Sequence, residues 1–231
     1  MRKNYQCIFF DLDHTLWDYE TNSASTLMEM FELFNLQECD FSFGDFLRHF
    51  REVNHHLWNL YDNGKIDSTT IRQNRFVLIL DKLNIQSEKL ARDLSHYYLK
   101  ECPKKTALMP GAMETLQHLT VKYRLTVVTN GFDEIQFTKL SSAGLLPFFE
   151  HIVTSEKAGH KKPAREIFIY ALHQNNITAA DALMVGDNPL TDIAGASRAA
   201  IDAILFNPEK VAHQCNPLHE INHLSELRSL L

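Results

Sequence analysis

Two patterns of apolar and polar positions divide this chain of 231 residues. From residue 16 to residue 107 the apolar side chains recur every three or four positions, which is typical of amphipathic helices. The clearest stripes are Leu27, Met30, Phe31 and Phe34; Phe46, Phe50, Val53, Leu57 and Leu60; and Phe76, Ile79, Leu80 and Leu83. A helix-start cluster from Asp67 to Thr70 precedes the third stripe, and a fourth helix is expected over 87–100. This segment is therefore predicted to be a small all-α bundle.

Short continuous apolar runs, typical of strands buried on both faces, lie on either side of this helical segment. The expected strands are 5–10, 124–129, 151–154, 182–187 and 203–206, and helical patterns accompany them near 112–120, 134–143, 165–175, 190–199 and 224–231. Alternation of this kind predicts βαβ units and a parallel sheet with right-handed crossovers. The predicted fold class is α/β, with a doubly wound parallel sheet into which the helical segment is inserted directly after the first strand.

Composition and charge exclude several classes of protein. A hydrophobic content of 45% argues against disorder. The net charge of −6, with no basic cluster beyond 160–162, argues against a nucleic-acid partner, because surfaces that bind phosphate backbones need clustered lysine and arginine. The four cysteines are far apart and are expected to be reduced thiols. No segment resembles a signal peptide or a membrane span, so we expect a soluble, cytoplasmic monomer or homodimer without a membrane partner.

The first predicted strand ends on two carboxylates, Asp11 and Asp13, in the stretch FFDLDHT. Ligands of open α/β folds bind at the carboxyl edge of the sheet, so these acids are placed for chemistry. The D-x-D-x-T pattern alone is only suggestive, because ordinary composition produces it in roughly a few per cent of such chains. The stretch does not fit a calcium-binding loop, in which Leu16 and Asn22 would replace the required glycine and glutamate.

Polar side chains also follow the other predicted strands. They are Thr129 and Asn130 before Gly131, Lys162 before Pro163, Asp187 after Gly186, and Asp192 five residues later. Singly, each has an ordinary structural interpretation: Thr129 as a helix cap, Lys161 or Lys162 as a solvated charge, Asp187 as the cap of a helix starting at Pro189, and Asp192 as an exposed carboxylate. Together, these polar residues follow successive predicted strands, and parallel strands end at one edge of a sheet. They are therefore predicted to share one crevice. A sugar-nucleotide Asp-x-Asp site would explain only the first motif.

The expected crevice suits a divalent cation and a phosphate. Clustered carboxylates repel one another unless a cation lies among them, and oxygen-only ligands favour Mg²⁺. Lys162 adds a second positive charge, and the Thr129 hydroxyl with nearby main-chain amides can bind phosphate oxygens. Such a set favours electrostatic stabilisation of phosphoryl transfer.

The stretches FFDLDHTL, VVTNG, KKPAREIF and MVGDNPLTDIAGA resemble, in this order, the four motifs of the haloacid dehalogenase superfamily. The helical insertion is similar to the type-1 cap of that superfamily. Within it, the stretches EVNHHLWNLYDNGKI, VVTNGF and SEKAGHKKPAREIFIYAL resemble the pyrimidine 5′-nucleotidases. The resemblance implies a Rossmann-like catalytic core over 1–15 and 108–231, and a cap over 16–107 that acts as a lid and selects the substrate.

The resemblance also implies roles for individual residues. Asp11 is the nucleophile that forms an aspartyl-phosphate, and Asp13 is the general acid and then the general base. Family members that act on carbon–halogen bonds lack the second aspartate, which this chain has. The resemblance further implies that Asp11, the Asp13 main-chain carbonyl and Asp187 bind Mg²⁺. It implies that Thr129, Asn130 and Lys162 bind the phosphate, and that Asp192 orients water or Lys162. The leaving group is expected to contact His14, Asn54 and Trp58. Lys162 is preferred to Lys161 because it directly precedes a proline, and Trp58 equally fits the core of the cap.

The function that follows is a Mg²⁺-dependent phosphomonoester hydrolase whose small-molecule substrate is a pyrimidine nucleoside monophosphate. One alternative is a phosphatase for a sugar phosphate or phosphoglycolate with the same core chemistry, and a mutase would return the phosphate to the sugar. A non-catalytic phosphate-binding module would be expected to have lost Asp11 or Asp13, and both are present.

Overall fold

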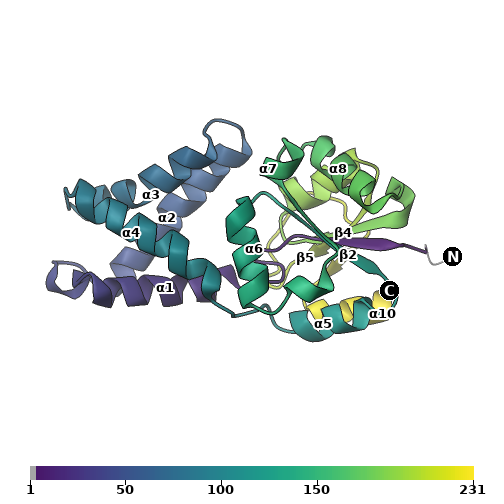
Figure 1. Ribbon diagram of the computed structural model, residues 1–231, viewed down its shortest axis with the longest axis horizontal. Coiled ribbons are helices and arrows are strands. Elements are labelled where there is room, and N and C mark those ends of the chain that lie inside the picture. The colour runs from purple at the N-terminus through teal and green to yellow at the C-terminus, as the bar shows by residue number, and fades with distance from the viewer. Residues whose placement is uncertain (1–3) are drawn as a thin grey trace. The chain divides into compact units, whose positions relative to one another are not determined.

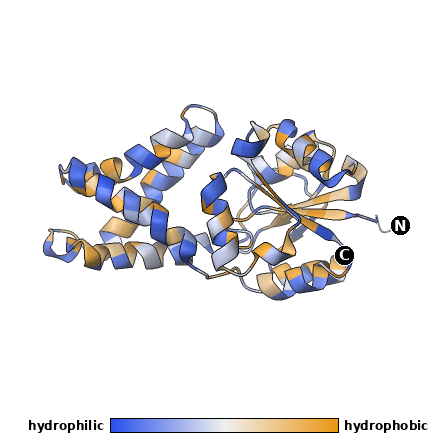
Figure 2. Cartoon of the chain, viewed as in Figure 1, coloured by the Kyte–Doolittle hydropathy of each residue, from blue (hydrophilic) through white to orange (hydrophobic). Residues whose placement is uncertain are grey.

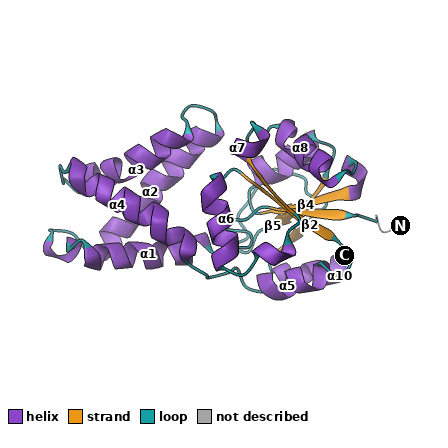
Figure 3. Cartoon of the chain, viewed as in Figure 1, coloured by secondary structure: helices purple, strands orange, loops and turns teal. Residues whose placement is uncertain are grey.

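The computed structural model describes residues 4–231, which form two compact units (Figure 1). The first unit contains the chain up to Tyr19 together with Thr106–Leu231, and the second contains Glu20–Lys105. Within the described residues, all strands belong to the first unit, and the second consists of helices and loops (Figure 3).

Six parallel strands form the sheet of the first unit in the order β3-β2-β1-β4-β5-β6. Their bounds are β1 Cys7–Phe10, β2 Arg124–Thr129, β3 His151–Thr154, β4 Ala182–Gly186, β5 Asp202–Phe206 and β6 His219–Ile221. The chain leaves β1 toward β2 and β3, then crosses to the other side of β1 at β4. The carboxyl ends of β1 and β4 therefore flank the switch point of strand order, where ligands bind in folds of this type.

Helices cover both faces of the sheet, so the predicted α/β doubly wound fold is confirmed. Their bounds are α5 Ala112–Leu119, α6 Asp133–Ser142, α7 Ser155–Ala158, α8 Arg165–Asn175, α9 Ala194–Arg198 and α10 Leu227–Leu230. In Figure 1, α5 and α10 lie on one side of the sheet and α8 lies on the other.

Burial on both faces explains why β1 is a continuous apolar run. Cys7 and Phe9 belong to the core cluster that α8 covers, whereas Ile8 and Phe10 are fully buried and point to the opposite face. The strands are correspondingly among the most hydrophobic parts of the chain (Figure 2).

Four main helices make the second unit, as the apolar stripes predict. They are α1 Tyr19–Leu33, α2 Phe43–Asp62, α3 Ser68–Lys82 and α4 Glu88–Glu101. Asp67 is the N-cap of α3 and accepts a hydrogen bond from the Thr70 N–H at 2.8 Å, which confirms the predicted helix start. Phe50 packs against Phe76 and Tyr98 with ring centroids 6.0 and 5.1 Å apart, so the stripes meet in a common core.

The structure differs from the sequence-based expectation in several elements, among them the short helix α7, which was not expected. The short edge strand β6 was not expected, because only Ile221 of its three residues is buried and no apolar run marks it. The helix expected over 190–199 begins instead as a π-helical turn over Pro189–Ile193 and continues as α9. Among residues 4–231, no helix combines the length and the apolar character needed to cross a bilayer.

Candidate active site

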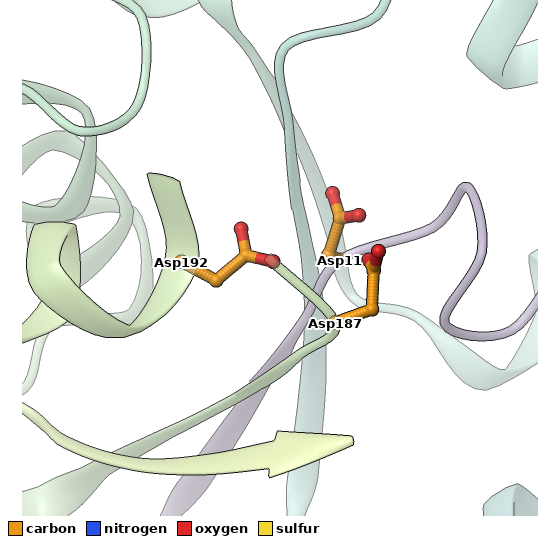
Figure 4. Close-up of side chains that lie close together, drawn as sticks. All are labelled: Asp11, Asp187 and Asp192. Carbon is orange, nitrogen blue, oxygen red and sulfur yellow. The ribbon is translucent and has the colours of Figure 1, made fainter. Parts of the chain in front are cut away.

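Three carboxylates converge at the carboxyl edge of the sheet (Figure 4). Asp11 follows β1, Asp187 follows β4, and Asp192 lies in the π-helical turn. One oxygen of each carboxylate lies within 4.8 Å of the others. Asp11 and Asp192 are buried, and Asp187 is partly exposed. The structure thus brings Asp11 together with two acids that lie far from it along the chain, at the switch point of the sheet.

Lys162 is the cation within this group. Its Nζ lies 2.5 Å from Asp11 Oδ1 and 2.7 Å from Asp192 Oδ1, and the residue is 2% exposed. Burial lowers the pKa of Lys162, but attraction to the two carboxylates outweighs burial and holds this pKa above its usual range. The interpretations of Lys162 as a solvated charge and of Asp192 as an exposed carboxylate are therefore wrong.

Lys162 does not compensate all of the negative charge. Burial raises the pKa of Asp11 well above its usual range, although Lys162 opposes this shift. Burial and then repulsion from Asp192 raise the pKa of Asp187 to about 7. Ionisation of these carboxyl groups is thus unfavourable in so crowded and poorly solvated a place, and a further cation would stabilise their ionised form. An oxygen-only set of carboxylates favours a hard cation such as Mg²⁺.

Without a divalent cation, the free energy of unfolding is expected to fall as the pH rises from about 4 to about 7, because of Asp187. The folded protein retains the Asp187 proton up to about pH 7, whereas the unfolded chain loses it near the ordinary aspartate pKa of 3.8. The folded state therefore binds more protons in this window, and linkage makes stability decrease with pH. Urea unfolding in EDTA at a series of pH values should show this slope, and Asp187→Asn should make it less steep, leaving the part that comes from Asp11.

The exposed Asp81 supplies the matched control, because Asp81→Asn removes a carboxylate outside the cluster. Its slope should equal that of the wild type. The assignment to Asp187 is contradicted when Asp187→Asn and Asp81→Asn unfold with the same pH dependence.

Asp187 is not the cap of the following helical turn. Asn188 is the cap, and its side-chain oxygen accepts hydrogen bonds from the Leu190 and Thr191 N–H groups at 2.9 and 3.1 Å. The Asp187 carboxylate instead accepts a hydrogen bond from the Thr15 hydroxyl at 3.0 Å. Asp187 is thereby oriented by the loop that follows β1, the strand that carries Asp11.

Both oxygens of Asp192 are engaged within the site. Oδ1 accepts from Lys162, and Oδ2 accepts from the Asn188 N–H at 3.0 Å. A Cβ at Gly186 would lie 2.2 Å from the same Oδ2, so a glycine is needed there for the carboxylate to approach β4. Asp192 is therefore arranged to hold Lys162 in place.

Thr129 and Asn130 form the turn that follows β2. The buried Thr129 hydroxyl accepts a hydrogen bond from the Gly131 N–H at 3.0 Å. The Asn130 side chain binds the main chain of Lys162, with Oδ1 accepting from its N–H at 2.7 Å and Nδ2 donating to its carbonyl at 2.9 Å. Asn130 thus fixes the segment that presents the Lys162 ammonium group.

The Asp13 side chain contacts helix α6. Lys139 Nζ lies 2.5 Å from Asp13 Oδ1 and 2.7 Å from Oδ2, and Gln136 Nε2 donates to Oδ2 at 3.3 Å. Sequence reasoning missed both partners. The available signal was a buried helical stripe that contains two polar residues, namely Phe132, Gln136, Lys139, Leu140 and Ala143.

The three candidates for contact with a leaving group are divided between the units. His14 follows the β1 strand, is exposed, and has its ring 4.9 Å from that of Tyr19. Asn54 and Trp58 lie on α2 of the helical unit. Trp58 is partly exposed, so it is not a fully buried core residue, and its ring packs edge-on against Tyr61 at 5.4 Å.

The fold and the carboxylate–lysine cluster at its switch point define a Rossmann-like α/β protein with an acidic centre that contains a buried lysine. A family model described as haloacid dehalogenase-like hydrolase matches residues 8–206. The chain belongs to this hydrolase family, which confirms the resemblance of its four motifs.

Several relatives match nearly the whole chain. The pyrimidine 5′-nucleotidase YjjG of Escherichia coli is 32% identical over 97% of this chain and 96% of its own. The ribulose-1,5-bisphosphate 5-phosphatase of Halopiger xanaduensis is 28% identical over 97% and 98%. The crystal structure of the HAD-hydrolase YfnB of Bacillus subtilis, solved with bound magnesium, is 28% identical over 99% of both chains and has a TM-score of 0.88. Nucleotidases and sugar phosphatases are thus both found among the relatives.

Proposed function

We propose that this protein is a Mg²⁺-dependent phosphomonoester hydrolase, a 5′-nucleotidase that acts on pyrimidine nucleoside monophosphates. The observation that carries the proposal is the grouping of Asp11, Asp187 and Asp192 around the buried Lys162. A cluster of anions with one fixed cation can hold a second cation and a phosphate group in contact. The similarity to a pyrimidine 5′-nucleotidase over nearly the full length supports the choice of substrate.

The proposed Mg²⁺ ligands are the carboxylates of Asp11 and Asp187 and the main-chain carbonyl of Asp13. When bound, the ion would neutralise charge on the carboxylates and on the phosphoryl group. Asp192 is assigned to Lys162 instead of the ion, because both of its oxygens already accept hydrogen bonds.

The phosphoryl group is proposed to bind beside Lys162 and Thr129. The ammonium group, already placed 2.5 Å from Asp11, would donate to a phosphoryl oxygen next to the attacking carboxylate. The Thr129 hydroxyl accepts from the Gly131 N–H and so keeps its own proton, which it would donate to a second phosphoryl oxygen. Asn130 would act in addition through its two hydrogen bonds to the Lys162 main chain.

Hydrolysis then takes two steps. A carboxylate oxygen of Asp11 attacks phosphorus and the bond from phosphorus to the ester oxygen breaks, while Asp13 donates a proton to the departing oxygen. A water molecule next attacks the aspartyl-phosphate and gives its proton to Asp13. The phosphorus–Asp11 bond breaks, so inorganic phosphate leaves and both carboxyl groups return to their starting state. Asp13 supports this route over dehalogenation, because carbon–halogen cleavage needs no acid for an alkoxide leaving group.

Selection of the leaving group is proposed to be the task of the helical segment 16–107. The Asn54 side-chain oxygen supports this assignment, because it is buried without a hydrogen-bond partner among residues 4–231. The partly exposed Trp58 on the same helix is proposed to offer a ring for stacking on a base, and the contact of the exposed His14, which lies in the first unit, stays a prediction.

Phosphate release across a panel of esters tests this function. With Mg²⁺, UMP, dUMP and dTMP are expected to be hydrolysed with the highest kcat/KM, and AMP, ribose 5-phosphate, ribulose 1,5-bisphosphate and phosphoglycolate more slowly. EDTA should abolish release from all of them, and added Mg²⁺ should restore it. The similarity to a ribulose-1,5-bisphosphate 5-phosphatase makes a sugar phosphatase the second candidate, which a higher kcat/KM for the sugar esters would favour. Release that is unaffected by EDTA would contradict the metal site.

A further inference from the structure

An ammonium group from α6 is buried against the Asp13 carboxylate. The side chain of Lys139 is 6% exposed, that of Asp13 is 25% exposed, and Nζ contacts both carboxylate oxygens. The ammonium group also lies 4.4 Å from the centroid of the Trp17 ring and 5.8 Å from that of Tyr19. These rings favour a cation at this point, so Nζ is held from two sides.

This arrangement is unfavourable for stability compared with apolar packing. Lysine side chains are rarely buried, and removing an ammonium and a carboxylate group from water opposes folding before their mutual attraction is counted. Trp17 is fully buried, and an apolar side chain at position 139 would pack against it without this penalty. The ion pair therefore calls for an explanation other than stability of the fold.

Gln136 adds a second unfavourable feature at the same carboxylate. Its Nε2 donates to Asp13, while its side-chain oxygen is buried with no partner in the described part of the chain. Leaving a buried oxygen without a hydrogen bond is unfavourable for folding. A Cβ at Gly131 would lie 2.0 Å from Gln136 Nε2, so the glycine of the β2 turn leaves the space that this amide occupies.

The main chain around Asp13 is fixed as well. Asp13 pairs with Trp17 in an isolated β-bridge, and the His14 N–H donates to the Trp17 carbonyl at 3.0 Å. Trp17, whose ring contacts the ammonium group, thus also fixes the backbone of Asp13. With the backbone fixed, the contacts to α6 determine where the carboxylate points, and its partial exposure leaves it accessible to a substrate.

We propose that Lys139 and Gln136 are positioning residues that hold the Asp13 carboxyl group at the place where it serves the leaving oxygen and the attacking water. This inference rests on the proposed function, because it assumes that Asp13 takes part in ester hydrolysis. Neither α6 side chain is assigned a contact with the substrate. Their effect on the reaction passes through Asp13, as effects on a positioned general acid do.

Single-turnover rates with two kinds of ester test the proposal. The alkyl phosphate hydrolysed fastest in the substrate panel needs an acid for its leaving oxygen, whereas p-nitrophenyl phosphate releases a stabilised anion. In Lys139→Met, release of the alcohol is expected to slow by about 10²-fold, the scale of a misplaced catalytic group. Release of p-nitrophenol should slow far less, and KM should be unchanged for both esters.

The double variant Asp13→Asn/Lys139→Met gives the decisive comparison. When Lys139 acts only through Asp13, the double variant is no slower than Asp13→Asn alone. The proposal would be overturned if the rate reductions of the two single variants multiplied in the double variant. It would also be overturned if Lys139→Met slowed both esters equally or raised KM. Lys157→Met is the matched control, because it removes an exposed Lys–Asp pair with Asp133 in the same unit and should retain the wild-type rates.

Gln136→Leu provides a second test should Lys139→Met fail to fold, because it removes only the longer hydrogen bond. It is expected to show the same preference for p-nitrophenyl phosphate to a smaller degree, and wild-type rates with the alkyl ester would then overturn the proposal. Wild-type activity of Asp11→Asn or Asp13→Asn would instead refute the proposed function. Loss of activity in those two variants, with wild-type rates in Lys139→Met, would refute the positioning role alone.

Discussion

Replacing Asp11 by asparagine is expected to lower the rate of phosphate release by about 10⁶-fold, the scale on which loss of a nucleophile acts in enzymes with a covalent intermediate. The amide cannot form the bond to phosphorus that divides the hydrolysis into two steps. Acid-quenched reactions with a ³²P-labelled ester should show label on the wild-type protein and none on Asp11→Asn. Because Asp11 Oδ1 contacts Lys162, the folding of the variant should be checked by its unfolding transition.

Asp18→Asn is a suitable control for this experiment, because Asp18 lies in the same loop region but outside the carboxylate cluster. It should be labelled like the wild type. Label that persists on Asp11→Asn, or turnover at the wild-type rate, would refute the covalent mechanism.

Asp13→Asn is expected to slow the hydrolysis of an alkyl phosphate by about 10²–10⁴-fold, because asparagine can neither donate the proton to the leaving oxygen nor accept one from water. In a single turnover, release of p-nitrophenol from p-nitrophenyl phosphate should stay close to the wild-type rate. Breakdown of the aspartyl-phosphate should be slow with either ester, so labelled protein should accumulate.

Asp133→Asn removes a carboxylate from the exposed end of α6 and serves as the control for Asp13→Asn. It should neither accumulate labelled protein nor distinguish the two esters. If Asp13→Asn lowered the rates of hydrolysis of both esters equally, Asp13 would act in some other way than as a general acid.

Much of the fold follows from local patterns in the sequence. The run that forms β1 is apolar at every position because both faces of a central parallel strand are buried, and the α3 stripe repeats at helical spacing behind its Asp67 cap. The strand β6 has no such pattern, since an edge strand that buries one residue needs no apolar run. The π-helical turn also escapes prediction, because the hydrogen bonds of Asn188 and Asp192 shape it instead of helix propensity.

The candidate site divides in the same way. Asp11, Thr129 and Asp187 could be predicted because each stands at a strand end, and Lys162 because it lies in the segment that follows β3, since parallel strands end at one edge. The role of the Asn130 side chain could not be predicted, because its partner is the main chain of Lys162, more than thirty positions away. Local patterns in the sequence carry no information about contacts over such a separation. Lys139 and Gln136 were missed for a related reason, since their partner Asp13 lies on another element.

The sequence by itself determined the α/β class, the helical insertion and the acids that end the strands, because burial of apolar side chains and the alternation of elements act over short stretches of chain. Only the tertiary structure decided which charges meet: Lys162 between Asp11 and Asp192, and Lys139 on Asp13. The physical reason is that an ion pair between distant residues depends on positions in space, whereas any residue of the right charge satisfies the sequence pattern. Burial then raises the energetic importance of these pairs, and burial of a charged side chain is a property of the packed molecule.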